Sequence, residues 1–263
     1  MINFSLKNRI RITTAVLQRE SKSRFGNKLT GAFWIFFEPA VQIIIFGSLF
    51  YFRDISGPYN SNIFAFISIS VIIFLNFSKT FSRCMGALDS NKTLLSYPIL
   101  KPIDTLIARA ILEAIIYSFI LIIFIFIALY YNLIETIEKP MFLILSMINS
   151  TILGFSLGTI TASISSFYKP ISNFIAPINR LLFLSSGIFF CASMLPQFAQ
   201  EILLWNPVFH MTEMARYSII DGFNNEFLNL RYVIIIQYIF VVLAASSLSI
   251  AEKSTVSNIR GNQ

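Results

Sequence analysis

Few residues of this chain could do chemistry, and they are widely separated. Glu38 precedes Pro39 inside a long apolar stretch, and His210, Glu213 and Arg216 follow one another in a second apolar region. A carboxylate near hydrocarbon costs on the order of 3 kcal/mol, so we expect Glu38 to face protein or water. A lone histidine without neighbouring cysteines or spaced carboxylates does not make a metal site. These residues are candidates for contact with a ligand rather than for catalysis.

No nucleotide site is predicted in this chain. The phosphate-binding pattern G-x-x-x-x-G-K-[ST] is missing, and Gly26-Asn-Lys-Leu-Thr-Gly31 has the wrong order and spacing for it. The acidic residues are scattered singly, without the apposed carboxylates or metal cluster that a membrane enzyme acting on lipid-linked sugars would need. We therefore expect no catalytic residue, no metal and no cofactor bound by this chain.

The elements that position these residues are predicted to be membrane helices. Of 263 residues, 56% are hydrophobic and 13% are charged, a composition too apolar for one water-soluble core. A hydrocarbon core about 30 Å thick needs roughly 20 apolar residues per helix. The runs do not alternate as barrel strands would, so an all-α integral membrane protein is expected. The six predicted spans are 32–52, 63–82, 110–131, 141–165, 171–193 and 232–251.

The distribution of basic residues predicts the orientation. If the N-terminus is cytoplasmic, the external side holds only four of the 20 basic residues, namely Arg53, Lys139, Arg216 and Arg231. Both termini are then cytoplasmic. The net charge of +7 reflects this asymmetry and favours anionic lipid heads over nucleic acid as a partner. Cys84 and Cys191 fall on opposite sides of the membrane and cannot pair.

One transmembrane domain is expected over residues 1–263, with a cytoplasmic amphipathic segment (1–31), a six-helix membrane domain (32–251) and a cytoplasmic tail (252–263). In the first segment, one helix face is apolar, which is typical of a helix in the membrane interface; a solvated basic leader is the alternative. This face consists of Ile2, Leu6, Ile10, Thr13 and Leu17. No cleavable signal peptide is expected, so the first span would be the insertion signal.

The connection between the fifth and sixth predicted spans is long enough for further helices. Asn206-Pro207 is a cap and first-turn pair that starts a helix, and Gly222 is placed to end it. This helix and the apolar run before it are each too short to cross, which predicts a short re-entrant pair. His210, Glu213 and Tyr217 share one face of the second helix; a surface helix with its polar side in water is the alternative.

Two further segments have predicted roles in packing and coupling. Gly154-Phe-Ser-Leu-Gly158 is a small-xxx-small motif that lets two helices approach closely. The segment from Arg83 to Asp104 is the longest cytoplasmic connection after the N-terminus, and a short helix is expected in it before Pro98.

Three segments of the chain together carry a resemblance. They are Arg24-Phe25-Gly26 with Gly31, Trp34 and Glu38-Pro39; Leu100 to Arg109 running into Glu113; and Trp205 to His210 with Glu213 and Arg216. These segments resemble the type-2 ABC transporter permeases that export capsular polysaccharide in Gram-negative bacteria. Related permeases for O-antigen and teichoic acid share this plan but commonly carry Gln in place of Glu38, which favours capsule. An ion-driven secondary transporter is a further alternative, although Glu38, Glu113 and Arg180 each lie near the end of a span rather than at mid-membrane.

The resemblance implies an assembly in the bacterial inner membrane. It implies a second copy of the chain, two ATP-binding subunits that hold ATP and magnesium, a lipid-linked polysaccharide substrate, a periplasmic polysaccharide co-polymerase and an outer-membrane exporter. The loop from Arg83 to Lys101 would dock on the ATPase. Its candidate coupling residues are Arg83, Asp89, Lys92, Leu94, Leu95 and Lys101.

Candidate residues of the substrate path combine aromatic rings, which stack on sugars, with charged groups. They are Arg24, Trp34, Phe37, Glu38, Trp205, His210, Glu213 and Arg216. An anionic headgroup would meet basic residues at the inner mouth, where Arg19, Lys22 and Lys28 lie beside Arg24. The alternative is that these basic residues only fix the topology.

Overall fold

The computed structural model describes residues 6–26, 29–95, 97, 99–224 and 226–261. Over these residues the fold is all helical, without strands, as expected. Short 3-10 turns at Pro58–Asn60, Lys169–Phe174 and Ala192–Met194 separate some of the helices. The helices are α1 (Leu6–Phe25), α2 (Leu29–Tyr51), α3 (Ile63–Met85), α4 (Ala87–Ser90), α5 (Lys92–Leu95), α6 (Pro102–Tyr130), α7 (Pro140–Phe167), α8 (Ile175–Ser185), α9 (Gln197–Leu203), α10 (Pro207–Ile219) and α11 (Leu230–Gly261).

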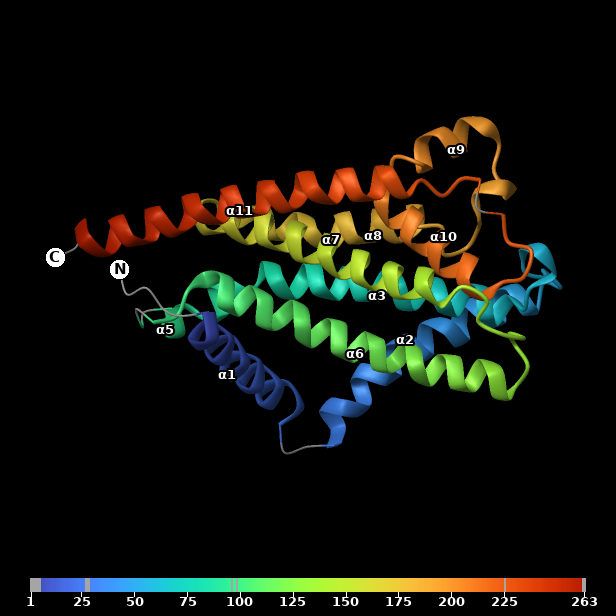
Figure 1. The fold of residues 1–263 in the computed structure, drawn as a ribbon, viewed down its shortest axis with the longest axis horizontal. Coiled ribbons are helices and arrows are strands. Elements are labelled where there is room, and N and C mark those ends of the chain that lie inside the picture. Colours follow the sequence, from blue (N-terminus) through green and yellow to red (C-terminus); the bar gives the residue numbers. More distant parts are fainter. Residues whose placement is uncertain (1–5, 27–28, 96, 98, 225, 262–263) are drawn as a thin grey trace.

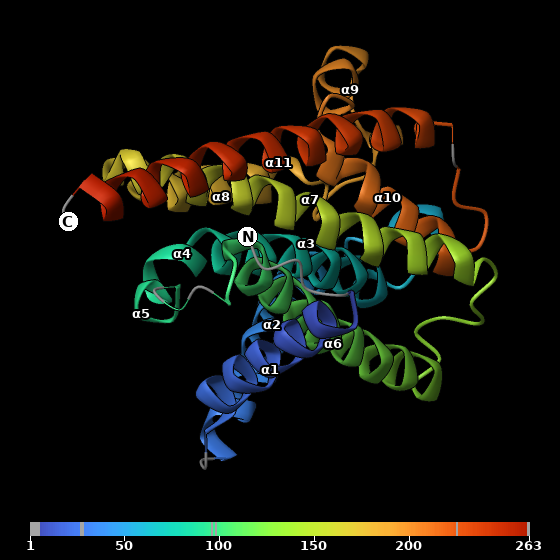
Figure 2. The same cartoon turned by 60° about the vertical axis from the view of Figure 1, so that its left-hand side comes forward.

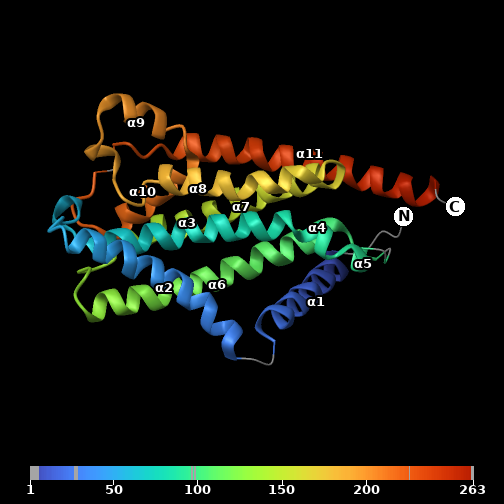
Figure 3. The same cartoon turned by 180° about the vertical axis from the view of Figure 1, so that it is seen from behind.

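Helix α3 is the centre of the bundle. Most of its residues are buried, and α7, α6, α2 and α10 all pack on it. Helices α1, α4, α5 and the last turns of α11 lie at one end of the molecule, while α9 and α10 lie at the other (Figure 1). Seen from behind, α2 runs along the outside of the bundle (Figure 3). The start of α1 and the end of α11 therefore share one end.

Five helices of the described chain are long and apolar enough to span a membrane, one fewer than predicted. The predicted span 171–193 is not a continuous helix. Pro170 and Pro177 lack the backbone N–H that a continuing helix needs, and the chain forms a 3-10 turn before α8 starts. Gly187, at φ +74°, follows the end of α8. The 11 residues of α8 rise only about 16 Å, too little for a hydrocarbon core about 30 Å thick.

The packing predicted for the small-xxx-small motif is confirmed on α7, which contacts α3. A Cβ on Gly154 would lie 2.6 Å from the Phe77 carbonyl oxygen, and one on Gly158 would lie 2.5 Å from the Cys84 Cβ. Nearby, the buried Asn76 amide of α3 donates to the Ser150 hydroxyl of α7 at 2.7 Å. The two backbones approach so closely only because the glycines have no side chain.

Helix α1 contacts α6 through a charged face rather than through its apolar one. Arg9 Nη1 lies 2.7 Å from Asp104 Oδ2, and Glu20 Oε1 lies 3.1 Å from Arg109 Nη2. Val16, on the same face, is buried, whereas Ile10 of the predicted apolar face is mostly exposed. In Figure 2, α1 lies across the bundle beside α6. Of the other predicted members of that face, the Thr13 hydroxyl donates to Asp104 Oδ1 at 3.5 Å, Leu17 is half-buried, and Ile2 lies outside the described residues, so the exposed apolar side chain observed on this face is Ile10.

The inner loop contains two short helices, α4 and α5, where one was expected before Pro98; Pro98 itself lies outside the described residues. Lys92 and Asp89 form an ion pair of 2.7 Å on this loop. Tyr97 and Ile99, which follow α5, are exposed. The loop therefore presents apolar side chains at the end of the bundle.

Candidate functional site

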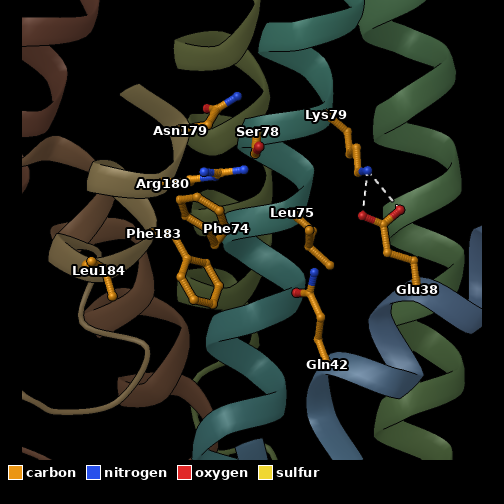
Figure 4. A pocket seen from close by; sticks show the side chains of 10 residues that line it. All are labelled: Glu38, Gln42, Phe74, Leu75, Ser78, Lys79, Asn179, Arg180, Phe183 and Leu184. Carbon is orange, nitrogen blue, oxygen red and sulfur yellow. Dashed lines mark hydrogen bonds and ion pairs between the residues drawn. The ribbon is translucent and has the colours of Figure 1, made fainter. Parts of the chain in front are cut away.

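A cavity of about 430 Å³ opens between α2, α3 and α8. Figure 4 shows that polar side chains from all three helices point into it. Its walls are Glu38, Gln42, Phe74, Leu75, Ser78, Lys79, Asn179, Arg180, Phe183 and Leu184. The cavity therefore combines charged groups with an apolar wall.

An ion pair joins α2 to α3 at the edge of this cavity. Lys79 Nζ donates to Glu38 Oε1 at 2.6 Å and to Glu38 Oε2 at 2.7 Å. The Glu38 side chain is 43% exposed and that of Lys79 is 30% exposed, so both remain open to the cavity. Pro39 follows in the same helix and lacks the N–H that would bond the Ile35 carbonyl, which weakens the helix here. The expectation that Glu38 faces protein or water is confirmed.

Several polar groups of the cavity have no partner in the part of the chain that the structure describes. Gln42 Oε1 and Asn179 Oδ1 are buried without a hydrogen bond, although Asn179 Nδ2 donates to Ser82 Oγ at 3.2 Å. Arg180 is exposed, and no ion pair to it is found among the described residues. With Lys79 and Arg180 against Glu38, the cavity carries one net positive charge. Such a site suits an anionic group attached to an apolar chain.

A different ion pair, outside this cavity, lies on the buried helix α10. Arg216 Nη1 lies 3.1 Å from Glu213 Oε1, and the two side chains are 0% and 4% exposed. The guanidinium also donates to the carbonyl oxygens of Phe190 (2.9 Å), Gly187 (2.5 Å) and Ile188 (3.0 Å). It lies 3.6 Å from the centre of the Phe66 ring. Arg216 therefore holds the irregular chain after α8 against α3.

His210 on α10 is also buried and hydrogen-bonded. Its Nε2 lies 2.9 Å from the Leu204 carbonyl oxygen, and burial lowers its pKa, so the ring is neutral near pH 7. Asn206 caps α10 by accepting from the Val208 N–H at 3.0 Å, as predicted. The alternative of a surface helix with its polar side in water is wrong, because His210 and Glu213 face the protein interior.

The structure divides the predicted substrate-path residues into two groups. Arg24 lies on α1 and forms an ion pair with the buried Glu113, while Trp34, Phe37 and Glu38 lie on α2. Trp205 precedes α10, and His210, Glu213 and Arg216 lie on it. The three aromatic candidates, Trp34, Phe37 and Trp205, are exposed on the single subunit.

The predicted inner-mouth and coupling residues lie near α1, α4 and α5. Arg19 Nη1 donates to Asn91 Oδ1 at 2.9 Å, and Lys22 is exposed. Lys28 lies outside the described residues. Leu94 and Leu95 are half-buried. The remaining coupling candidates are Arg83, which lies 3.6 Å from Glu113, the Asp89 and Lys92 pair, and Lys101, whose backbone N–H donates to Asp104.

Sequence reasoning missed the partners of Glu38 in the cavity. Lys79, Gln42 and Asn179 were not singled out, and Arg180 was noted only as an ionisable group near a span end. A signal was available, because Gln42 follows Glu38 by one helical turn and Asn179 precedes Arg180 in an apolar stretch. Among the residues that the structure describes, no group of three or more His, Cys, Asp or Glu side chains that could hold a metal ion is found.

Comparison with known proteins places this geometry in a family. A model of the family described as ABC-2 type transporter matches residues 12–220. The chain is 30% identical to the polysialic acid transport protein KpsM of Escherichia coli over 225 residues, 83% of this chain and 85% of KpsM. It is 26% identical to the capsule polysaccharide export inner-membrane protein BexB of Haemophilus influenzae, over 79% of this chain and 78% of BexB.

A third relative covers almost the whole chain. The capsule polysaccharide export inner-membrane protein CtrC of Neisseria meningitidis serogroup B is 24% identical over 245 residues, 93% of this chain and 92% of CtrC. The family match runs from α1 through α10 and so includes both ion pairs described above. The protein therefore belongs to the ABC-2 type transporter family and is the transmembrane subunit of an ABC transporter, a multi-pass inner-membrane protein that is not itself an ATPase.

Proposed function

We propose that this subunit exports lipid-linked capsular polysaccharide across the inner membrane. The similarity to KpsM, BexB and CtrC supports the substrate class. The observation that carries the proposal furthest is the cavity between α2, α3 and α8, in which two cations and one carboxylate border an apolar wall. Family membership removes a membrane enzyme and a secondary transporter from the alternatives. O-antigen or teichoic-acid export remains the alternative substrate class.

The cavity would receive the charged end of the lipid carrier. A phosphate group would pair with Arg180 and compete with Glu38 for Lys79, because arginine and lysine both bind phosphate strongly. The apolar wall of Phe74, Phe183 and Leu184 would contact the carrier's hydrocarbon chain. The basic residues of α1, among them Lys22, would attract the anionic headgroup toward the cavity.

The proposed assembly contains two copies of this chain and two ATPase subunits that bind ATP and magnesium. The α4–α5 loop, with its exposed Tyr97 and Ile99, supplies an apolar surface for the ATPase. A periplasmic co-polymerase and an outer-membrane exporter would continue the path outward. The substrate path would connect the inner cavity with the end that holds α10.

The proposed topology has six crossings, five by the long helices and one by the irregular segment that contains the 3-10 turn and α8. The 3-10 turn Lys169–Phe174 and α8 together would return the chain toward α9. Both termini would then be cytoplasmic, which agrees with the shared end of α1 and α11 (Figure 1). Helix α1 would lie in the membrane interface with its Ile10 face toward lipid, and α9 and α10 would form the re-entrant pair.

Deletion of the gene in its own host tests the function. We expect polysaccharide to disappear from the cell surface and to accumulate in the cytoplasm, and the wild-type gene to restore export. Extraction of surface and intracellular polysaccharide, followed by sugar analysis, measures both pools. Unchanged surface polysaccharide would contradict the proposal, and loss of O-antigen or teichoic acid instead of capsule would favour the alternative substrate class.

The coupling loop allows a separate prediction. Replacing Leu94 and Leu95 with Glu should prevent the ATPase from co-purifying with this subunit, because charges would replace the half-buried apolar side chains of α5. The matched control replaces Phe198 and Ile202, exposed on α9 at the other end of the molecule, in the same way. Normal ATPase recovery with the α5 variant would show that the loop does not dock there.

A further inference from the structure

A second cavity of about 310 Å³ lies at the end of the bundle that holds α9 and α10. It is bordered by the chain that joins α9 to α10 and by the start of α11. Its walls are Leu204, Trp205, His210, Glu226, Phe227, Asn229 and Tyr232. Four of these seven side chains carry aromatic rings, an unusual concentration for one small cavity.

The aromatic walls are fixed by hydrogen bonds. Tyr232 Oη donates to the Trp205 carbonyl oxygen at 2.5 Å, and the His210 ring is bonded to the Leu204 carbonyl oxygen. The ring centres of His210 and Tyr232 are 5.3 Å apart. The Trp205 side chain is 77% exposed, although its backbone is held by Tyr232. The cavity therefore holds the His210 and Tyr232 rings in set positions, which lowers the entropy cost of binding a ligand.

The polar groups of the cavity are a carboxylate and an amide. Glu226 Oε2 accepts from the Asn224 amide at 2.9 Å, and no described residue bonds its other oxygen. Asn229 Oδ1 accepts from the Tyr232 N–H at 3.0 Å, while no donor bond from Asn229 Nδ2 is found in the described chain. The walls contain no lysine or arginine. For a ligand, the Glu226 carboxylate thus offers a hydrogen-bond acceptor and the Asn229 amide offers a donor. The negative charge of Glu226 disfavours anions.

We propose that this cavity binds one neutral sugar ring of the exported polymer. The C–H face of a pyranose would stack on Trp205 or Phe227, and its hydroxyls would bond Glu226 and Asn229. The volume is at the small end of the range for ligand sites, roughly 300 to 1,000 Å³, which suits a single sugar unit. This inference rests on the proposed function, because it takes the polymer as the ligand.

Tryptophan fluorescence gives a direct test. The chain contains two tryptophans, so the variant Trp34→Phe leaves Trp205 as the sole reporter. The purified protein in detergent is titrated with the methyl glycosides of glucose, galactose and N-acetylglucosamine. The matched anionic probes are the glucuronide and galacturonide, and the matched cationic probe is the glucosaminide.

We expect a saturable change in Trp205 fluorescence with at least one neutral glycoside. The acid form of that glycoside should bind at least about fivefold more weakly, as a charge repulsion of about 1 kcal/mol implies. Glu226→Gln should reduce this discrimination. Equal or tighter binding of the acid, or no saturable response to any neutral glycoside, would overturn the proposal. Tightest binding of the glucosaminide would overturn it in favour of a cation site formed by the aromatic rings.

Variants in and beside the cavity separate binding from folding. Phe227→Ala should weaken binding of the neutral glycoside at least about fivefold, since it removes a ring worth about 1 kcal/mol. Phe198→Ala on α9, an exposed ring outside the cavity, should leave binding unchanged. Equal loss in both variants would overturn the proposal. The binding measurement does not depend on transport. If deletion of the gene left capsule export normal, the proposed function would be refuted, but the measured binding of the sugar would still stand.

Discussion

Two carboxylate and cation pairs, in separate regions of the bundle, differ in how they are enclosed. Glu213 and Arg216 on α10 are buried, and three backbone carbonyls complete the bonding of the guanidinium. Glu38 and Lys79 are partly exposed in a cavity where Gln42 Oε1 and Asn179 Oδ1 have no partner in the described chain. A buried charge must stay paired, whereas a pair in an open cavity can exchange partners.

The contrast assigns different roles to the two pairs. Arg216 joins α10, α3 and the chain after α8, so its interactions stabilise one conformation of the protein. Lys79 joins α2 to α3 through flexible side chains, next to a proline that weakens α2. We therefore propose that the pair on α10 serves stability and the pair in the cavity serves transport.

The largest predicted effect follows removal of the buried cation. Arg216→Met should destabilise the protein by about 3 to 5 kcal/mol, because Glu213 and three carbonyls lose their partner. The midpoint of thermal unfolding in detergent and the amount of protein in the membrane measure this loss. Lys92→Met, which breaks the exposed pair with Asp89, is the control and should change little. If Arg216→Met unfolded at the same midpoint as the wild type, the proposed structural role of Arg216 would be contradicted.

Reversal of the cavity pair should affect export more than stability. Glu38→Lys places two like charges together, at a cost of about 1 to 4 kcal/mol across the range from water to a protein surface. Export should fall in this variant and in Lys79→Glu, and the double variant should recover much of it. Surface polysaccharide measures the effect. A double variant no better than either single one would show that the two residues act independently.

The two regions also differ in how well the sequence predicts them. The start of α10 depends on two adjacent residues, Asn206 and Pro207, so the sequence predicts it. The cost of placing a carboxylate in hydrocarbon likewise predicts that Glu38 faces protein or water. Its partner Lys79 depends on which face of α3 meets α2, which helical periodicity alone does not reveal. Hydropathy likewise predicts a span over 171–193, although the 3-10 turn before Ile175 and the left-handed Gly187 after α8 interrupt it.

Helix α1 shows the same limit in another form. Its apolar residues predict an amphipathic helix, and a helix is present. Its contact with α6, however, is made by Arg9, Glu20 and Arg24, whose partners are more than 80 positions away in sequence. The sequence pattern of a single helix does not reveal ion pairs between positions so far apart in the chain.

The smallest predicted effect concerns this contact of α1. Arg9→Gln removes the pair with Asp104, but because Arg9 is partly exposed the loss should be below about 1 kcal/mol. The unfolding midpoint should fall slightly at low salt and hardly at high salt, since salt screens the wild-type pair. A large fall in the unfolding midpoint that salt does not change would show that Arg9 acts as a buried cation instead.

The comparison between the two ion pairs is tested most directly by Glu38→Gln and Glu213→Gln, measured side by side as surface polysaccharide per molecule of membrane-inserted subunit. We predict that Glu38→Gln lowers export per molecule at normal abundance, and that Glu213→Gln lowers abundance while the remaining molecules export normally. Normal export per molecule in Glu38→Gln, with defective export per molecule in Glu213→Gln, would contradict the account.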